Sequence, residues 1–188
     1  SERLTRLINQ VLDHAKMDAG RMEWRMADVE PAGSIEEALA ATGGLIGNRP
    51  IRLEVDVPES LPTVRADRDR LIQVIVNLVS NAIKSCDRDE GEVAVAARAT
   101  SGGLHVTVAD NGPGIPPAMR ARIFERFQQF DSTLADKLQG TGLGLSICRQ
   151  IIEHFGGRIW VECEPGEGAR FHFTVPGTAA ARRGAAAE

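Results

Sequence analysis

The chain has 188 residues, of which 43% are hydrophobic and 26% charged, as is ordinary for one globular domain or one domain with an appendage. Its net charge of −4 and the lack of a basic patch with interleaved aromatics exclude nucleic acid as an expected partner. The sequence has no run as long as a membrane span, no opening signal peptide and no metal or redox spacing among its three cysteines. We therefore expect a soluble domain with reduced thiols; if the parent protein has a membrane anchor, it lies outside this segment.

The N-terminal segment predicts a helix that ends near Gly20, because apolar residues recur at helical spacing from Leu4 to Ala15. A short isolated helix is marginal in water, so its apolar stripe predicts a packing partner. Beyond it, the pattern predicts a strand over 22–29, a helix over 34–46 and a strand over 51–57.

The first motif lies in an amphipathic run over 67–84 that predicts a helix. Asn77 and Asn81 are four residues apart and therefore share one face of that helix. Their two amide oxygens can converge on one hard cation, which prefers oxygen ligands.

The second motif, Asp110-Asn-Gly-Pro-Gly114, follows two predicted strands over 92–98 and 104–109. A carboxylate at a strand end can accept two hydrogen bonds, which suits the exocyclic amine and ring of an adenine. A short helix over 116–127 and a polar segment over 128–139, expected to act as a lid, come next.

The third motif, Gly140-Thr-Gly-Leu-Gly144, opens a predicted helix that runs to Phe155. Glycines at a helix start let backbone N–H groups face an anion, and the helix dipole favours phosphate there. Two strands, over 158–162 and 170–175, and a tail over 177–188 complete the chain.

Other glycine-loop nucleotide sites do not fit these motifs. A P-loop needs Gly-Lys-Ser/Thr, which does not occur, and the dinucleotide fingerprint needs glycine where Leu145 stands. The His-Arg-Asp loop of protein kinases is also absent from the sequence.

Taken in order, the motifs resemble the catalytic, ATP-binding domain of bacterial sensor histidine kinases. That family shares an ATPase superfamily with gyrase, mismatch-repair and heat-shock chaperone ATPases, and the resemblance covers residues 1–176. Residues 77–84 resemble the N box, 110–115 the G1 box, 123–127 the F box, 140–145 the G2 box, and 166–168 with 170–175 the closing glycine turn and last strand.

The resemblance implies an α+β fold, a two-layer α/β sandwich in which helices cover one face of a mixed sheet (a Bergerat-type ATP-binding fold), preceded by an N-terminal helix. It divides the chain into residues 1–20, the C-terminal helix of an incomplete dimerisation and phosphoacceptor hairpin; 21–176, the catalytic domain; and 177–188, a disordered tail. An ordinary N-terminal helix packed on the domain is the alternative for the first part.

The cofactors implied are ATP and Mg²⁺. Asn77 and Asn81 would hold the metal, Lys84 would approach a phosphate as the third member of the catalytic set, and Asp110 would read adenine. The other implied nucleotide contacts are Gly112, Gly114, Ile115, Lys137, Gly140, Thr141, Gly142, Leu143 and Gly144. A solvated Lys137, and core rather than lid-anchoring roles for Phe124 and Phe127, are the alternatives.

Asn77 helps to distinguish ATP hydrolysis from phosphoryl transfer. Superfamily members that hydrolyse ATP resemble this segment but carry a glutamate at this position, because a carboxylate can activate the attacking water. The sequence therefore favours transfer of the γ-phosphoryl group to a histidine over hydrolysis. An ATP hydrolase and an ATP-binding signalling module without transferase activity are the alternatives.

The acceptor histidine of such a kinase resembles His-Glu/Asp-x-x-x-Pro, and none of His14, His105, His154 and His172 has that surrounding. We expect them to be packing or surface residues and the acceptor to lie outside this chain. The implied partners are the phosphoacceptor hairpin of the same or a sister kinase and the receiver domain of a response regulator, within a cytoplasmic, homodimeric bacterial kinase.

Two positions depart from the family pattern. Ser85 stands where an aromatic residue is usual, which predicts modest nucleotide affinity. Ala169 stands where serine or threonine is usual, and the alternation of the last strand is kept.

Overall fold

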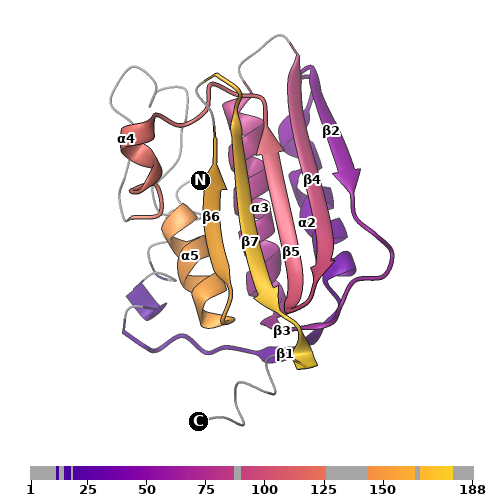
Figure 1. Cartoon of the computed structure of the whole chain (residues 1–188), viewed down its shortest axis with the longest axis vertical. Coiled ribbons are helices and arrows are strands. Elements are labelled where there is room, and N and C mark those ends of the chain that lie inside the picture. The colour runs from indigo at the N-terminus through magenta and orange to yellow at the C-terminus, as the bar shows by residue number, and fades with distance from the viewer. Residues whose placement is uncertain are drawn as a thin grey trace.

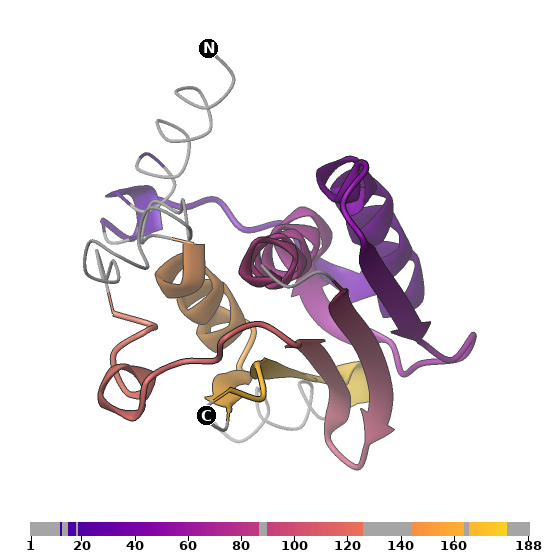
Figure 2. The ribbon, with the colours of Figure 1, turned by 90° about the horizontal axis from the view of Figure 1, so that it is seen from above.

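The computed structural model describes residues 12, 15–17, 19–86, 90–125, 144–163 and 166–179. In this part of the chain a sheet forms one layer and helices form a second layer on one of its faces (Figures 1 and 2). The predicted α+β sandwich is confirmed.

The main sheet has five strands in the order β2-β4-β5-β7-β6. Their bounds are Ile51–Asp56 (β2), Gly91–Thr100 (β4), Gly103–Asp110 (β5), Arg158–Glu162 (β6) and Ala169–Pro176 (β7). β2 and β4 pair in parallel and the other neighbours pair antiparallel, so the sheet is mixed, as expected. Because β5 lies at the centre, its last residue, Asp110, is flanked by both β4 and β7.

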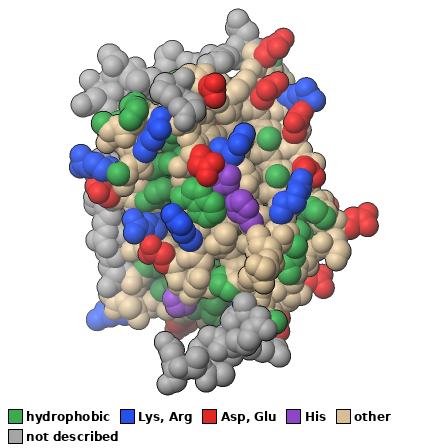
Figure 3. All heavy atoms as spheres, in the orientation of Figure 1, with side chains coloured by type: hydrophobic (Ala, Val, Ile, Leu, Met, Phe, Trp, Pro, Cys, Tyr) green, Lys and Arg blue, Asp and Glu red, His purple; other side chains and the backbone are tan. Residues whose placement is uncertain are grey.

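The strands bury one face of the sheet and leave the other open. Along β5, Leu104, Val106 and Val108 are buried, whereas the residues between them are partly exposed. This two-residue period places the apolar side chains under the helices. Figure 3 looks onto the open face, where histidines lie among charged side chains and a hydrophobic patch.

Three helices cover the buried face: α2 (Pro31–Ile46), α3 (Arg68–Ser85) and α5 (Gly144–His154) (Figure 2). α3 packs against both α2 and α5 and is therefore the middle helix of the layer. Its buried residues recur at helical spacing: Leu71, Val74, Ile75, Leu78, Val79, Ala82 and Ile83. Polar residues are thereby confined to the flanks of α3.

A second, two-stranded sheet pairs β1 (Met26–Val29) with β3 (Val64–Asp67), antiparallel. β3 was not predicted, and the predicted start of the first strand at residue 22 was wrong, because β1 begins at Met26. β3 has only four residues, Val-Arg-Ala-Asp, and such a short run shows no clear alternation. Its pairing partner is distant in the sequence, so only the tertiary fold forms it.

The predicted helix over 116–127 was also wrong in length, because α4 covers only Pro117–Arg120. After it, Arg122 and Glu125 donate backbone hydrogen bonds to carbonyls three residues back, as in turns. Residues 126 and 127 lie outside the described part of the chain.

The described helical residues 15–17 are followed by a turn at Gly20, near which the sequence predicts the end of a helix. The Gly20 N–H donates to the Met17 carbonyl (3.0 Å), and the Arg21 N–H donates to the Lys16 carbonyl (2.8 Å). With a φ of 62° at Gly20, these bonds form a Schellman cap. Within the described residues, no helix is long and apolar enough to cross a membrane.

The linker after this helix is attached to both α3 and α5. The Trp24 ring stacks on His154 at the end of α5, with centroids 3.8 Å apart and 10° between planes, and meets Phe155 edge-on. The Arg25 N–H donates to Asp67, the N-cap of α3 (2.9 Å). The linker therefore lies against the start of one helix and the end of the other.

The first residues of the predicted tail are hydrogen-bonded to the domain. The Gly177 N–H donates to the Gly102 carbonyl (2.8 Å), and the Thr178 N–H donates to the Thr63 carbonyl (2.9 Å). Residues 180–188 of that tail lie outside the described residues.

Candidate functional site

α3 carries three of the predicted site residues along one stripe. Asn77, Asn81 and Lys84 are partly exposed, whereas Leu78 and Ala82 beside them are buried. Spacings of four and three residues keep the three polar side chains on one flank of the helix.

Asn77 lies where α3 meets the first turns of α5. A Cβ atom built on Gly144 would be 3.9 Å from the Asn77 side-chain Cγ. The Asn77 Nδ2 donates to the Cys148 Sγ (3.7 Å), and that thiol donates to the Val74 carbonyl (3.9 Å). Burial raises the pKa of Cys148 to about 12, so the thiol is neutral. Because Nδ2 faces Cys148, the amide oxygen of Asn77 is the atom that can coordinate a cation.

Asp110 ends the central strand as a buried carboxyl group, 8% exposed. Its Oδ1 accepts a hydrogen bond from the Gly112 N–H (2.9 Å). Burial raises the pKa of Asp110 to about 6, although the N–H groups of Gly112 and Ala169 oppose that shift. At neutral pH the group is therefore mainly an ionised acceptor in a poorly solvated place, which suits a ligand with N–H donors.

Two glycines let the turn after Asp110 pack closely. A Cβ on Gly112 would lie 2.7 Å from the Ser85 carbonyl oxygen, and one on Gly168 would lie 1.8 Å from the Asp110 carbonyl oxygen. Gly114 has a φ of 77°, which a residue with a side chain adopts only with strain. The turn is thus held between the end of α3 and the start of β7.

Asn111 stabilises the same turn, although no role was predicted for it. Its Oδ1 accepts from the Glu92 N–H (2.9 Å) and from the Cys86 thiol (3.6 Å), and its Nδ2 donates to the Glu90 carbonyl (2.9 Å). Its place in an Asp-Asn-Gly run was the available signal, since asparagine commonly bonds nearby backbone in turns.

Ile115, the last predicted contact of this turn, is buried, and its carbonyl accepts from the Arg120 Nε (3.2 Å) and the Cys163 thiol (3.5 Å). The remaining predicted contacts lie outside the described residues: Lys137, Gly140, Thr141, Gly142 and Leu143, together with Phe127 and the lid over 128–139.

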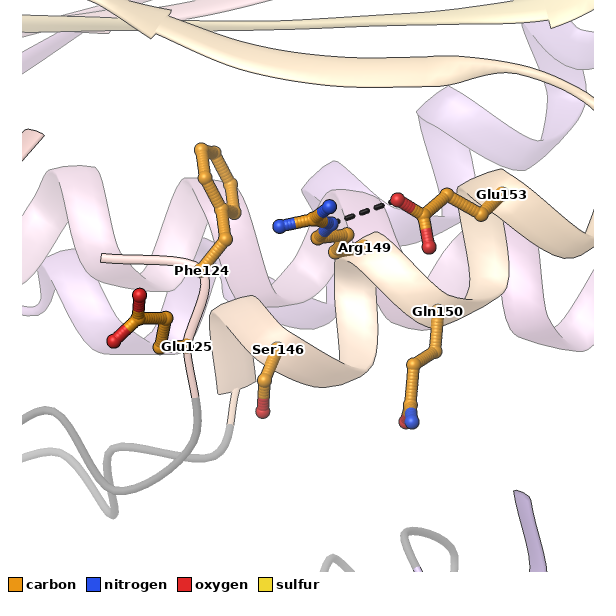
Figure 4. Close-up of a pocket in the computed structure, with 6 residues that line it drawn as sticks. All are labelled: Phe124, Glu125, Ser146, Arg149, Gln150 and Glu153. Atoms are coloured by element: carbon orange, nitrogen blue, oxygen red, sulfur yellow. Dashed lines mark hydrogen bonds and ion pairs between the residues drawn. The ribbon is translucent and has the colours of Figure 1, made fainter. Parts of the chain in front are cut away.

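A pocket of about 480 Å³ lies between the F-box segment and α5 (Figure 4). Its described lining residues are Phe124, Glu125, Ser146, Arg149, Gln150 and Glu153. None of these six residues is a predicted nucleotide contact. Phe124 also meets Phe171 of β7 edge-on, which is a packing contact.

The three described histidines take part in ring stacks. His105, His172 and Trp160 stack on one another across β5, β7 and β6, with centroids 5.0 to 5.4 Å apart. His154 stacks on Trp24. These stacks agree with the expectation that the three are packing or surface residues, whereas His14 lies outside the described residues.

Amide side chains along the middle helix, a buried carboxyl at the end of the central strand and a layer of helices on one face of a mixed sheet are the features expected of a two-layer ATP-binding domain. The family model "Histidine kinase-, DNA gyrase B-, and HSP90-like ATPase" matches residues 66–179. The chain belongs to this family and, within it, to the catalytic ATP-binding domains of histidine kinases.

Two curated relatives illustrate this membership. Cyanobacterial phytochrome A of Nostoc sp. is 38% identical over 175 residues, which are 90% of this chain and 21% of the relative. Adaptive-response sensory kinase SasA of Prochlorococcus marinus is 44% identical over 130 residues, 69% of this chain and 34% of the relative. The chain therefore spans about a fifth to a third of the length of these relatives.

Solved structures agree with the fold. Full-length ShkA in complex with AMPPNP has a TM-score of 0.80 at 36% identity, over 93% of this chain and 36% of that one. The catalytic domain of histidine kinase ThkA has a TM-score of 0.70 at 32% identity, over 83% of this chain and 99% of that one. ThkA in complex with the response regulator protein TrrA has a TM-score of 0.72 at 30% identity, over 94% and 49%.

Proposed function

We propose that this domain binds Mg·ATP and transfers the γ-phosphoryl group to a histidine on a dimerisation hairpin that this chain does not contain. The observation that carries the proposal is the side chain at position 77. Asn77 points its amide nitrogen at Cys148 and offers only an amide oxygen to the site, so it has no group that accepts a proton from water at neutral pH. Transfer to a protein acceptor therefore fits the site better than hydrolysis.

In this proposal the adenine lies at Asp110. The ionised carboxyl accepts a hydrogen bond from the exocyclic amine of the base. Gly112 and Gly114 have no side chains, so the backbone of the turn leaves space for the base. Ile115 and Gly144 line the site, and Lys84 supplies positive charge to a phosphate. We assign Lys137, Gly140, Thr141, Gly142 and Leu143 to the phosphates from sequence alone.

The oxygen ligands of the proposed site suit a metal ion that binds together with the nucleotide. Among the described residues, no group of three or more His, Cys, Asp or Glu side chains could hold a metal ion. Asn77 and Asn81 supply neutral amide oxygens, and Mg²⁺ is commonly bound by few protein oxygens together with substrate phosphates. When bound, Mg²⁺ neutralises charge on the transferring phosphate.

The partners follow from relatives and from the N-terminal segment. Full-length ShkA was solved with an ATP analogue and ThkA with the response regulator TrrA, and we extend both properties to this domain. We assign residues 1–20 to the second helix of the hairpin, with residues 21–176 as the catalytic domain of a homodimeric kinase. We also propose a cytoplasmic location, where ATP and a response regulator would both be within reach of the domain.

Transfer in trans tests the proposal. The chain is mixed with labelled ATP, Mg²⁺ and a separate hairpin that carries an acceptor histidine; we expect acid-labile label on the hairpin, formed slowly because the tether is missing. Asn81→Ala should abolish the label, whereas Asn48→Ala, an exposed asparagine in the turn after α2, should not. Release of free phosphate without labelled hairpin would indicate a hydrolase, and ATP binding with neither product would indicate a signalling module.

A further inference from the structure

The C-terminal end of α3 is held by a side chain from a different part of the fold. In the turn between α2 and β2, the Arg49 guanidinium donates to the Ile83 carbonyl (3.0 Å) and to the Cys86 carbonyl. Carbonyls at the end of a helix have no partner within the helix, and a cation there also interacts favourably with the helix dipole. Arg49 therefore holds the last turn of α3 through two hydrogen bonds, which we call the Arg49 clamp.

The backbone around Arg49 is itself fixed. The Arg49 N–H donates to the Ile46 carbonyl (3.0 Å), and the Arg49 carbonyl accepts from the Ile51 N–H (2.8 Å). The next carbonyl, of Pro50, accepts from the Gly91 N–H at the start of β4 (2.8 Å). The guanidinium thus reaches α3 from a point tied to the edge of the main sheet.

The clamped turn carries or touches both halves of the proposed nucleotide site. Lys84 lies between Ile83 and Cys86 in the sequence, and Asn81 lies one turn earlier. The backbone carbonyl of Asn81 accepts a hydrogen bond from the Ser85 hydroxyl (3.0 Å). The Ser85 carbonyl packs against Gly112, and the Cys86 thiol donates to Asn111. A shift of this turn would therefore move the metal and phosphate ligands relative to the adenine turn.

We infer that Arg49 is a positioning residue for Mg·ATP: it touches no part of the nucleotide, but fixes the end of α3 so that Asn81 and Lys84 are in register with the turn after Asp110. This inference rests on the proposed function. Without the clamp, a smaller fraction of molecules has the binding-competent arrangement, and apparent affinity falls by that fraction. Lysine is not an equivalent, because a single ammonium lacks the planar fork that reaches two carbonyls.

The experiment compares Arg49→Ala, Arg49→Lys and a control, Arg52→Ala, in the 188-residue chain. Arg52 pairs with Glu54, and its side chain is 71% exposed, so the control removes an arginine three positions away that does not hold α3. ATP affinity is titrated with and without Mg²⁺, and hydrogen exchange is followed at the Cys86 amide, which closes the helix on Ala82.

We expect Arg49→Ala to speed hydrogen exchange at the last turn of α3 and to weaken Mg·ATP binding by about fivefold or more. Most of the increase in ATP affinity that Mg²⁺ gives the unmodified chain should be lost. Arg49→Lys should be intermediate and Arg52→Ala unchanged. If Arg49→Ala lowers the melting temperature but Mg²⁺ still increases ATP affinity as much as in the unmodified chain, Arg49 has only a structural role and the inference is overturned. If Arg49→Ala does not fold, Arg49→Lys decides by the same readouts. Failure of the unmodified chain to bind ATP would instead reject the proposed function.

Discussion

Asp110 is a buried carboxyl group at the end of β5, and backbone N–H groups supply its hydrogen bonds. Its Oδ1 has a backbone donor in the turn, and the group is 8% exposed. A buried carboxylate of this kind tolerates little change in its surroundings, because a lost hydrogen bond is not replaced by water.

Asp110→Ala should remove nucleotide binding and leave the fold intact. Loss of the acceptor leaves the amine of adenine without its partner, at a cost of about 1–3 kcal/mol or more. Calorimetric titration with ADP measures the loss, and circular dichroism checks the fold. Affinity equal to that of the unmodified chain would show that adenine is not read by Asp110.

Nucleotide affinity should also fall in acid. Because burial raises the pKa of Asp110 to about 6, the free protein holds a proton there below that pH, and the acceptor form becomes scarce. The dissociation constant should then rise about tenfold for each further pH unit. ATP titrates in this range too, so Asp110→Asn, which does not titrate at this position, is the control; parallel pH profiles for the two proteins would contradict the prediction.

The raised pKa of Asp110 affects stability in the opposite direction to affinity: acid lowers nucleotide affinity but favours the folded state. The folded state binds the proton more tightly than the unfolded chain, whose Asp110 pKa is near 3.8. The contribution of this residue to folding is therefore most favourable below that value and is lost as pH rises towards about 6. Chemical denaturation of the unmodified chain and Asp110→Asn over that window should diverge accordingly.

At the scale of elements, the site depends on how closely the turn after β5 and the turn before β7 pack. Gly166 and Gly168 both have positive φ, of 82° and 86°. They differ in surroundings: a Cβ on Gly166 would meet nothing within 4 Å, whereas one on Gly168 would lie 1.8 Å from the Asp110 carbonyl oxygen. The pair separates backbone strain from steric overlap.

Gly168→Ala should destabilise the domain much more than Gly166→Ala. Both variants share the strain of positive φ, about 1 kcal/mol, but only Gly168→Ala must push β7 away from Asp110, a further cost of about 1–3 kcal/mol or more. Urea denaturation of the two variants measures the difference. Equal midpoints would mean that the close approach adds nothing to stability.

For the protein as a whole, the proposed function assigns the acceptor histidine to a segment other than those that carry the proposed catalytic site. The linker at Trp24 and Arg25 ties residues after the N-terminal helix to α3 and α5, and none of the four histidines has the sequence surrounding of an acceptor. Proximity supplies much of the rate of such transfers, so a catalytic domain without a positioned acceptor is inactive on itself.

The chain incubated alone with labelled ATP should therefore not become phosphorylated. Gel electrophoresis under alkaline conditions, which preserves phosphohistidine, measures the label. Acid-labile label on His14 would contradict the assignment of the missing acceptor to another segment.

Residue spacing along the chain was sufficient to predict most of the helices and strands and the order of the motifs. Helical periodicity over 67–84 predicted that Asn77 and Asn81 share a flank, and strand alternation placed Asp110 at a strand end; α3 and β5 confirm both. These features follow from residues close together in the chain, where spacing alone fixes geometry.

The contacts that complete the proposed site join residues far apart in the sequence and could not be predicted from local spacing. The Asn77 bond to Cys148 spans 71 positions, the Arg49 bond to Cys86 spans 37, and the pairing of β1 with β3 joins two short strands that no local pattern connects. The raised pKa of Asp110 likewise comes from burial between two neighbouring strands. Such contacts depend on which elements pack together, and a single sequence encodes that packing only through the energy of the whole fold.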